Sequence, residues 1–313
     1  MQTKLAVQFR KSRTTATAFE RLKTCKRCGA YSVLFDNSCK SCGARDKFIP
    51  VAEYASALNR VLPWAEAFGA VALVLLAVVF ADTLAQMAAA VAGGAVFLLL
   101  LFLLRKTYKP YAENNRLHKL LVDHTPDIAR GLRADLQEAL ADMEADKPKE
   151  AYEKLREIGY FLRGDSIKAR KVVCLNRFFI RKDMDLELEQ LIPASFSEPF
   201  VLYLWEAVKV NKRLVRRSVL DYVLAYRYHI ASMPNGKDIL ALIAGAAVRM
   251  KSYVKMYPYF IVDYLDELPK ERFHRLCMLM AATPAEERTI LYDKCKELAR
   301  SRYGFDPDFQ NIF

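Results

Sequence analysis

Two long apolar runs dominate the hydrophobic pattern of the chain. Residues 61–81 contain one charged residue, Glu66, residues 84–104 contain none, and Asp82 and Thr83 separate the runs. Each run is 21 residues long, and a helix of that length, at about 1.5 Å per residue, crosses a hydrocarbon core of about 30 Å. Neither run has the polar stripe of a soluble helix, so a buried soluble hairpin is the less favoured alternative. The pattern predicts a transmembrane helical hairpin over residues 61–104.

Charges at the ends of this hairpin predict its orientation. Arg60 precedes the first run and Arg105, Lys106 and Lys109 follow the second, whereas the connecting turn offers only Asp82. Basic residues collect on the cytoplasmic side of membrane proteins. We therefore expect a multi-pass protein of the cell inner (cytoplasmic) membrane with both termini in the cytoplasm.

Small residues within the runs allow helices to approach closely. Ala65 and Gly69 form one small-xxx-small pair, and Ala89 and Gly93 form another. Packing of the two helices on each other and homo-oligomerisation are both compatible with these pairs. Glu66 is expected near the cytoplasmic end of its helix, where a carboxylate stays hydrated.

From residue 127 onward the apolar positions recur at helical spacing. Ile128, Leu132, Leu136 and Leu140 follow one another at intervals of four, and strand-like alternation is absent. Expected helices cover residues 149–163, 166–181, 185–191, 198–210, 212–230, 236–250, 252–266, 269–281 and 284–303. The sequence predicts an all-α domain, either a helical-repeat array or a bundle, without a fixed repeat period. The helix after Leu104 is expected to end at Lys109-Pro110.

Two CxxCG motifs form the strongest local signal. Cys25 and Cys28 precede Gly29, and Cys39 and Cys42 precede Gly43. The two-residue spacer turns both sulfurs toward one ion, and glycine permits the left-handed backbone of such turns. A short hairpin is expected over residues 31–35, with its turn at residues 36–37.

The paired knuckles resemble the zinc-ribbon class over residues 21–48. This resemblance implies a structural Zn²⁺ held by Cys25, Cys28, Cys39 and Cys42, with no open position for catalysis. A disulfide is disfavoured by a reducing compartment, and a redox dithiol would need one CxxC in a βαβ setting. The remaining cysteines, Cys174, Cys277 and Cys295, are expected in the helical core.

The predicted organisation is mainly α, with a small N-terminal zinc ribbon (β), a two-helix transmembrane hairpin and a C-terminal all-α domain. The expected segments are a basic arm (1–24), the ribbon (25–48), a linker (49–60), the hairpin (61–104), a juxtamembrane linker (105–126) and a cytoplasmic helical domain (127–313). The arm is expected to be mobile or to form a first ribbon strand at residues 5–9. Its composition also fits a transit peptide, which is the minority alternative.

Charge is concentrated before the hairpin. Residues 1–62 contain 12 Lys and Arg and four acidic residues, whereas residues 110–313 contain 33 Lys and Arg and 30 acidic residues. The whole chain has a formal net charge of +12. Two basic stretches of the helical domain are candidates for contact with lipid headgroups or an acidic partner, against the simpler alternative of a solvated surface. Their residues are Arg163, Lys168, Arg170, Lys171, Arg177, Arg181, Lys182, Lys209, Lys212, Arg213, Arg216 and Arg217.

No enzymatic motif is present in the sequence: HExxH, GxxxxGK[ST], GxSxG and a strand-linked GxGxxG are missing. We therefore expect no enzyme and no catalytic residue, but a membrane-tethered scaffold or adaptor with protein partners. A subunit of an oligomeric channel or transport complex, and a membrane-bound nucleic-acid-binding regulator, are the alternatives. Nucleic acid is the less expected partner, since zinc ribbons contact proteins as readily.

Overall fold

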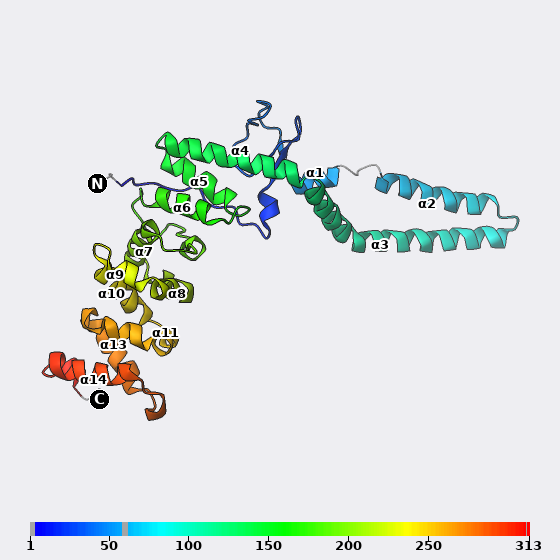
Figure 1. The fold of residues 1–313 in the computed structure, drawn as a ribbon. Coiled ribbons are helices and arrows are strands. Elements are labelled where there is room, and N and C mark those ends of the chain that lie inside the picture. Colours follow the sequence, from blue (N-terminus) through cyan, green and yellow to red (C-terminus); the bar gives the residue numbers. More distant parts are fainter. Residues whose placement is uncertain (1–3, 58–61, 311) are drawn as a thin grey trace. The chain divides into compact units, whose positions relative to one another are not determined.

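A computed structural model describes residues 4–57, 62–310 and 312–313. The chain divides into two compact units, which we describe separately. Lys11–Ala141 form the first, here called the ribbon unit, and Met1–Arg10 with Asp142–Phe313 form the second, the helical unit. The expected class, mainly helical with a small sheet near the N-terminus, is confirmed (Figure 1).

The sheet of the ribbon unit has three short antiparallel strands in the order β2-β1-β3. They are β1 (Lys23–Cys25), β2 (Tyr31–Ser32) and β3 (Phe48–Pro50), preceded by the 3-10 turn η1 (Ala18–Arg21). Pro50 ends an edge strand, where the missing N–H costs no ladder bond. The expected hairpin over residues 31–35 is wrong in detail, because β2 ends at Ser32 and its partner is β1.

Three helices follow the sheet: α1 (Val51–Ala57), α2 (Leu62–Val79) and α3 (Leu84–Asp123). Thr83 caps α3, since its hydroxyl accepts from Gln86 N at 3.3 Å while the Gln86 side chain accepts from the Thr83 N–H. This capping box places the turn of the hairpin at the break between the two apolar runs.

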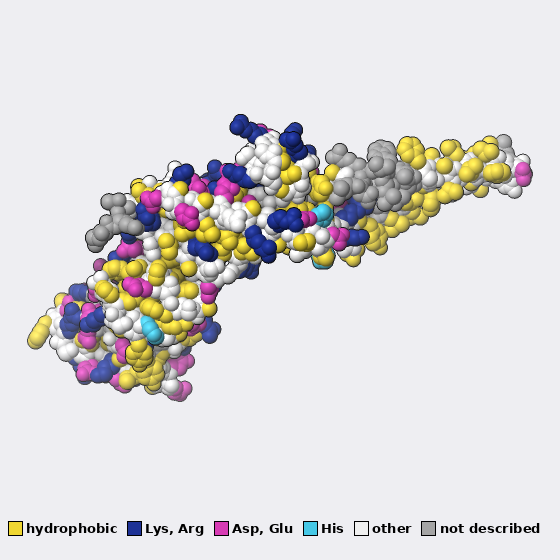
Figure 2. All heavy atoms as spheres, turned by 45° about the horizontal axis from the view of Figure 1, so that its top comes forward, with side chains coloured by type: hydrophobic (Ala, Val, Ile, Leu, Met, Phe, Trp, Pro, Cys, Tyr) yellow, Lys and Arg dark blue, Asp and Glu magenta, His cyan; other side chains and the backbone are white. Residues whose placement is uncertain are grey.

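Helix α3 is long and apolar enough to cross a membrane, with a mean hydropathy of 2.6 over its most apolar window. In α2, residues Phe68–Val79 form a shorter apolar helix. Figure 2 shows apolar side chains over most of the described surface of this hairpin. Arg60 and the side chain of Glu66 lie outside the described residues, so the expectations that rest on them stay predictions.

The two helices of the hairpin touch at a position next to the predicted one. A Cβ added to Gly94 would lie 2.3 Å from Cγ1 of Val74, whereas one added to Gly93 or Gly69 would meet nothing within 4 Å. Packing within the hairpin through Gly69 and Gly93 is therefore wrong, because both face away from the partner helix. The close approach of the backbones is at Gly94.

The expected end of the helix at Lys109-Pro110 is also wrong. Pro110 lies inside α3, which continues to Asp123. Proline removes one backbone hydrogen bond and bends a helix without necessarily ending it, and α1 packs against α3. Figure 1 shows that α3 changes direction along its length. Helix α4 (Thr125–Glu144) follows almost directly.

The helical unit consists of short helices that succeed one another with brief turns (Figure 1). They are α5 (Pro148–Ile158), α6 (Asp165–Leu175), α7 (Glu198–Val210), α8 (Arg217–Ala225), α9 (Arg227–Ala231), α10 (Gly236–Ala247), α11 (Lys251–Met256), α12 (Pro258–Asp263), α13 (Lys270–Ala281) and α14 (Ile290–Tyr303). The 3-10 turns are η2 (Leu188–Leu191), η3 (Lys212–Leu214), η4 (Leu265–Glu267), η5 (Ala285–Glu287) and η6 (Pro307–Phe309).

A continuous apolar core joins the last helices of this unit. Phe273 and Cys277 of α13 pack with Leu291 and Cys295 of α14, and all four are at most 1% exposed. Cys174 is also buried, which confirms that the three single cysteines are core residues. Each short helix therefore depends on its neighbours to bury its apolar face.

Candidate functional site

Two turns with the same hydrogen bond carry the four cysteines. Gly29 N donates to Cys25 O at 2.8 Å, and Gly43 N donates to Cys39 O at 2.8 Å. The two glycines have φ values of +71° and +69°, in the left-handed region where an L side chain is strained. Glycine after each CxxC pair is therefore a requirement of the turn.

The turns bring the four sulfur atoms together. All four lie within 4.8 Å of one another, with 3.7 Å between the Sγ atoms of Cys25 and Cys42 and 3.5 Å between those of Cys28 and Cys39. Tetrahedral thiolates at a metal–sulfur distance of about 2.3 Å would be about 3.8 Å apart. The cluster could thus hold one metal ion, and the four sulfurs would fill its coordination.

Backbone amides favour a charged sulfur in this cluster. Burial opposes the ionisation of Cys25, but the N–H groups of Cys28 and Arg27 donate toward its sulfur and lower its pKa to about 7. Desolvation of its sulfur raises the pKa of Cys28 to about 12, although the residue as a whole is exposed. A metal ion would therefore have to displace protons from part of the cluster, which makes metal binding dependent on pH.

Helix α4 holds the ribbon through a buried carboxylate. Asp135 is 6% exposed. Its Oδ1 accepts from Ser32 Oγ at 2.9 Å and its Oδ2 accepts from Val33 N at 2.8 Å. One turn earlier, a Cβ on Gly131 would lie 2.2 Å from the carbonyl oxygen of Tyr31. The strand that follows the first knuckle thus lies directly on the backbone of α4.

Burial also changes the ionisation of this contact. It raises the pKa of Asp135 to about 6, against the hydrogen bonds from Val33 and Ser32 that favour the carboxylate. Burial likewise lowers the pKa of Lys23 to about 8. The ammonium group of Lys23 donates to the carbonyl of Asp36, and its Nζ lies 4.4 Å from the Phe48 ring centre. Both contacts of this charged group are therefore within the ribbon.

Comparison with known proteins adds no family: no family model matches the chain, and no curated protein or solved structure matches it. The likeness to zinc ribbons therefore rests on the four cysteines and their turns.

The predicted basic stretches are mostly at the surface of the helical unit. Exposed members are Arg163, Arg181, Lys182, Lys209, Lys212, Arg213, Arg216 and Arg217, and half-buried members are Lys168, Arg170 and Arg177. Several lie next to carboxylates, as in the pairs Arg177–Asp146 (3.0 Å), Lys209–Glu206 (3.1 Å) and Arg216–Glu189 (2.8 Å). These partners reduce the positive charge that the stretches present.

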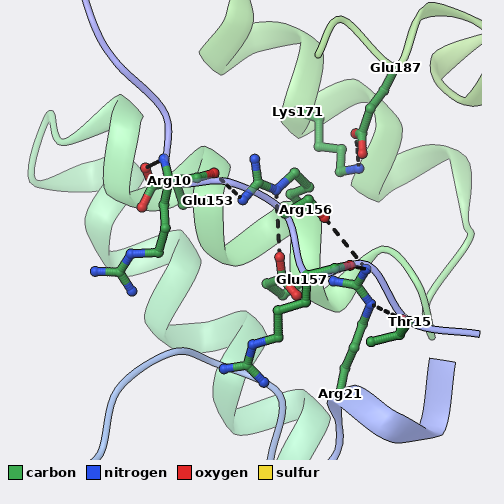
Figure 3. A network of polar contacts seen from close by, with 10 residues as sticks. Arg10, Thr15, Arg21, Glu153, Arg156, Glu157, Lys171 and Glu187 are labelled. Carbon is green, nitrogen blue, oxygen red and sulfur yellow. Dashed lines mark hydrogen bonds and ion pairs between the residues drawn. The ribbon is translucent and has the colours of Figure 1, made fainter. Parts of the chain in front are cut away.

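Lys171 is the exception among the predicted lipid contacts. It is 6% exposed and its Nζ lies 2.9 Å from Glu187 Oε2. Figure 3 shows the two side chains pointing toward each other. A buried lysine is stable only when paired. Lys171 is therefore a core ion pair, and its assignment to a lipid surface is wrong.

The N-terminal segment lies on the helical unit. Leu5 N donates to Arg177 O at 2.8 Å and Phe179 N donates to Leu5 O at 3.0 Å, which pairs Leu5 with Phe178 in parallel. A first ribbon strand at residues 5–9 is therefore wrong. The partner of this extended segment is more than 170 residues away in the sequence.

An aromatic contact continues this pairing. The Phe9 ring centre lies 4.8 Å from that of Tyr152 and 5.3 Å from that of Phe178. Tyr152 and Phe178 are both 0% exposed. The segment thus places one aromatic side chain on a floor made by α5 and the chain after α6.

Polar groups hold the backbone of the same segment. Arg156, 2% exposed, donates to Arg10 O at 2.8 Å, and Arg10 N donates to Glu153 Oε1 at 2.8 Å (Figure 3). At the exposed side, Arg181 donates to Val7 O at 3.2 Å. Lys4 Nζ lies 3.1 Å from Glu206 Oε2. We call the residues that hold segment 4–10 the docking surface: Tyr152, Glu153, Arg156, Phe178, Arg181 and Glu206.

Proposed function

We propose that this protein is a membrane-tethered adaptor. In this proposal α2 and α3 cross the membrane twice, the ribbon and the helical unit lie on the same cytoplasmic side, and the helical unit binds partner proteins. The ribbon supplies a second contact. No catalytic role is proposed, because the metal centre is closed by four protein ligands.

The observation that carries this proposal is the contact between the ribbon and α4. The ribbon precedes the apolar hairpin and α4 follows it, yet Asp135 binds Ser32 and Val33, and the Tyr31 and His124 ring centres are 5.9 Å apart. A single crossing by α3 would put these partners on opposite sides of the membrane. Their contact supports two crossings.

Orientation and membrane identity rest on charge. Arg105, Lys106 and Lys109 follow the apolar part of α3, and basic flanks favour the cytoplasmic side of an inner membrane. The exposed lysines and arginines of the helical unit would then face a layer of anionic headgroups.

We infer that the ion of the ribbon is Zn²⁺. Four sulfur ligands select Zn²⁺ or iron, and a ribbon of this size without a large core gains its stability from a structural metal. The purified protein should carry about one equivalent of zinc. Iron, with its colour, would contradict this assignment.

Binding of proteins by the helical unit is supported by its surface. It already holds an extended segment at the docking surface, and Tyr259 and Met278 are 70% and 52% exposed. Exposed apolar side chains are common at sites of protein contact. An extended stack of helices also offers a large area for such contacts.

The adaptor function can be tested by exchanging its parts. After residues 61–104 are replaced with an unrelated two-span hairpin, cross-linking at the membrane should recover the same partner proteins. The reason is that, in this proposal, the hairpin only anchors the chain in the membrane. Deleting residues 148–313, which spares Asp135 and the ribbon contact, should remove those proteins while insertion continues. Loss on hairpin exchange together with retention after the deletion would instead indicate a channel or transport subunit.

A further inference from the structure

The docking surface is built like a binding site for an extended peptide. It offers backbone pairing through the carbonyl of Arg177 and the N–H of Phe179, a floor of two buried rings for an aromatic side chain, and a buried Arg156 aimed at a backbone carbonyl. Strand addition with side-chain anchors is a common way in which proteins recognise extended segments.

The segment that occupies this surface is held only in part. Leu5 is 42% exposed and Phe9 is half-buried. Among the described residues 4–10, backbone-to-backbone pairing with the helical unit consists of the two bonds of Leu5. The hydroxyl of Tyr152 is buried without a hydrogen-bond partner among the described residues, although Phe9 covers its ring. A buried hydroxyl left unpaired is unfavourable, so residues 4–10 leave one donor of the surface unused.

A weak occupant can still fill the surface when it belongs to the same chain. A segment of the same chain competes as an intramolecular ligand, at an effective concentration that reaches about 1 mM for a short flexible tether. A second copy of the chain carries the same residues 4–10 and would compete at a disadvantage against this concentration. A different protein would meet the same competition, but a segment that fits better could overcome it through a higher affinity.

We propose that the docking surface is a peptide-binding site that the N-terminus blocks in cis, and that the partner of the adaptor is a protein with an extended segment that carries one basic residue at its start, as Lys4 does here. That segment would place an apolar residue where Leu5 pairs and an aromatic residue four positions later, with a basic residue before them to meet Glu206. This proposal names a partner class for the helical unit and so rests on the adaptor function.

A labelled peptide with the sequence of residues 1–11 tests the proposal by fluorescence anisotropy. In detergent, it should bind saturably to the protein that lacks residues 1–11, and at least tenfold more weakly to the full chain. Peptide variant Phe9→Ala should bind at least tenfold more weakly. Gln8→Ala is the matched control, because Gln8 is exposed, and should bind as the original does.

Two results would overturn the proposal. The first is absence of peptide binding to the truncated protein while it unfolds as cooperatively as the full chain. If the truncation does not fold, full-length Phe9→Ala replaces it with the same expectation. The second is a dimer of the full chain that Phe9→Ala abolishes, which would identify the occupant as a second copy. Peptide binding is measured on purified protein, whereas the hairpin replacement and the deletion of residues 148–313 are measured by cross-linking at the membrane. A failure of peptide binding would therefore contradict this proposal without deciding the adaptor function.

Discussion

The ribbon and the helical stack are held together in different ways. The ribbon has three strands of two or three residues, too few to form a core, and its order depends on four sulfurs and on one side chain of α4. The stack has a continuous core of aromatic, aliphatic and cysteine side chains from Val248, directly after α10, to the C-terminus. The first depends on a few strong contacts and the second on many weak ones, so single changes should affect them very differently.

The largest effect is expected from a metal ligand. Cys39→Ser should release the ion and unfold residues 23–50, since structural zinc contributes about 10–16 kcal/mol of apparent binding energy in small domains. Metal analysis and amide exchange measure the two losses. Cys174→Ala is the control, because Cys174 is buried in the helical unit and should leave the metal content unchanged. Release of metal by the control as well would mean that the two units do not unfold independently.

The next effect concerns the contact with α4. Gly131→Ala puts a methyl group 2.2 Å from the Tyr31 carbonyl, so the ribbon must shift, at a cost of about 2 kcal/mol. Amide exchange of β2 should accelerate while exchange in the helical stack stays the same. Gly164→Ala serves as the control, since its nearest neighbour would be Ser166 Oγ at 3.9 Å. Equal protection of β2 from amide exchange in both variants would contradict a close contact between Gly131 and Tyr31.

Neighbouring glycines allow a matched test in the hairpin. Gly94→Ile should separate α2 from α3, because the new side chain meets Val74 at once, whereas Gly93→Ile meets open space. The cost is about 1–3 kcal/mol for the first. Spin labels at Leu73 and Val96, both exposed, should report a wider distance distribution only in Gly94→Ile. A larger change in Gly93→Ile would place that face in a contact, such as an oligomer.

A smaller and gradual effect follows from Asp135. Its pKa is raised from 3.8 to about 6 in the fold, so its contribution to stability is complete below about pH 4 and is lost as the pH rises through 6. The slope is at most about 1.4 kcal/mol per pH unit. The pH dependence of metal release is common to wild type and Asp135→Asn, so it cancels when their unfolding free energies are subtracted. The difference between the two free energies should shrink from pH 5 to pH 7. A difference that grows over this range would contradict the raised pKa.

The smallest effect is expected at the basic surface. In nanodiscs of anionic lipid, a dye at position 212 should be quenched by spin-labelled headgroups more than in neutral discs, and less at high salt. Each lysine or arginine contributes about 1 kcal/mol near such a surface. Reversing Arg213, Arg216 and Arg217 to Glu should abolish the difference. Equal quenching in both lipids would leave these residues as a solvated surface.

Local patterns explain what could be predicted. The four cysteines and their glycines lie within 19 residues of one another, so spacing alone indicated a metal cluster. The length of the apolar run likewise indicated that α3 could cross a membrane. The spacing of apolar residues at helical intervals indicated that the C-terminal part is all-α. Each of these features depends on residues close in the sequence.

Contacts between distant residues explain what was missed. Phe9 and Tyr152 are 143 residues apart, and nothing in either local pattern names the other. Lys171 belongs to a basic stretch, but a carboxylate 16 residues later removes it from the surface. Gly93 and Gly94 differ by one position, and only the packing of α2 decides which of them faces Val74.

The position of Thr83 relative to the membrane tests the central claim most directly. In the proposed topology this residue, at the start of α3, lies outside the cell and both chain ends lie inside. In intact cells, Thr83→Cys should therefore react with a membrane-impermeant thiol reagent, while the native cysteines do not react, and reporters fused to residues 1 and 313 should be active in the cytoplasm. Labelling of Thr83→Cys only after the membrane is opened, or a reporter active outside, would contradict two crossings with the ribbon and the helical unit on the cytoplasmic side.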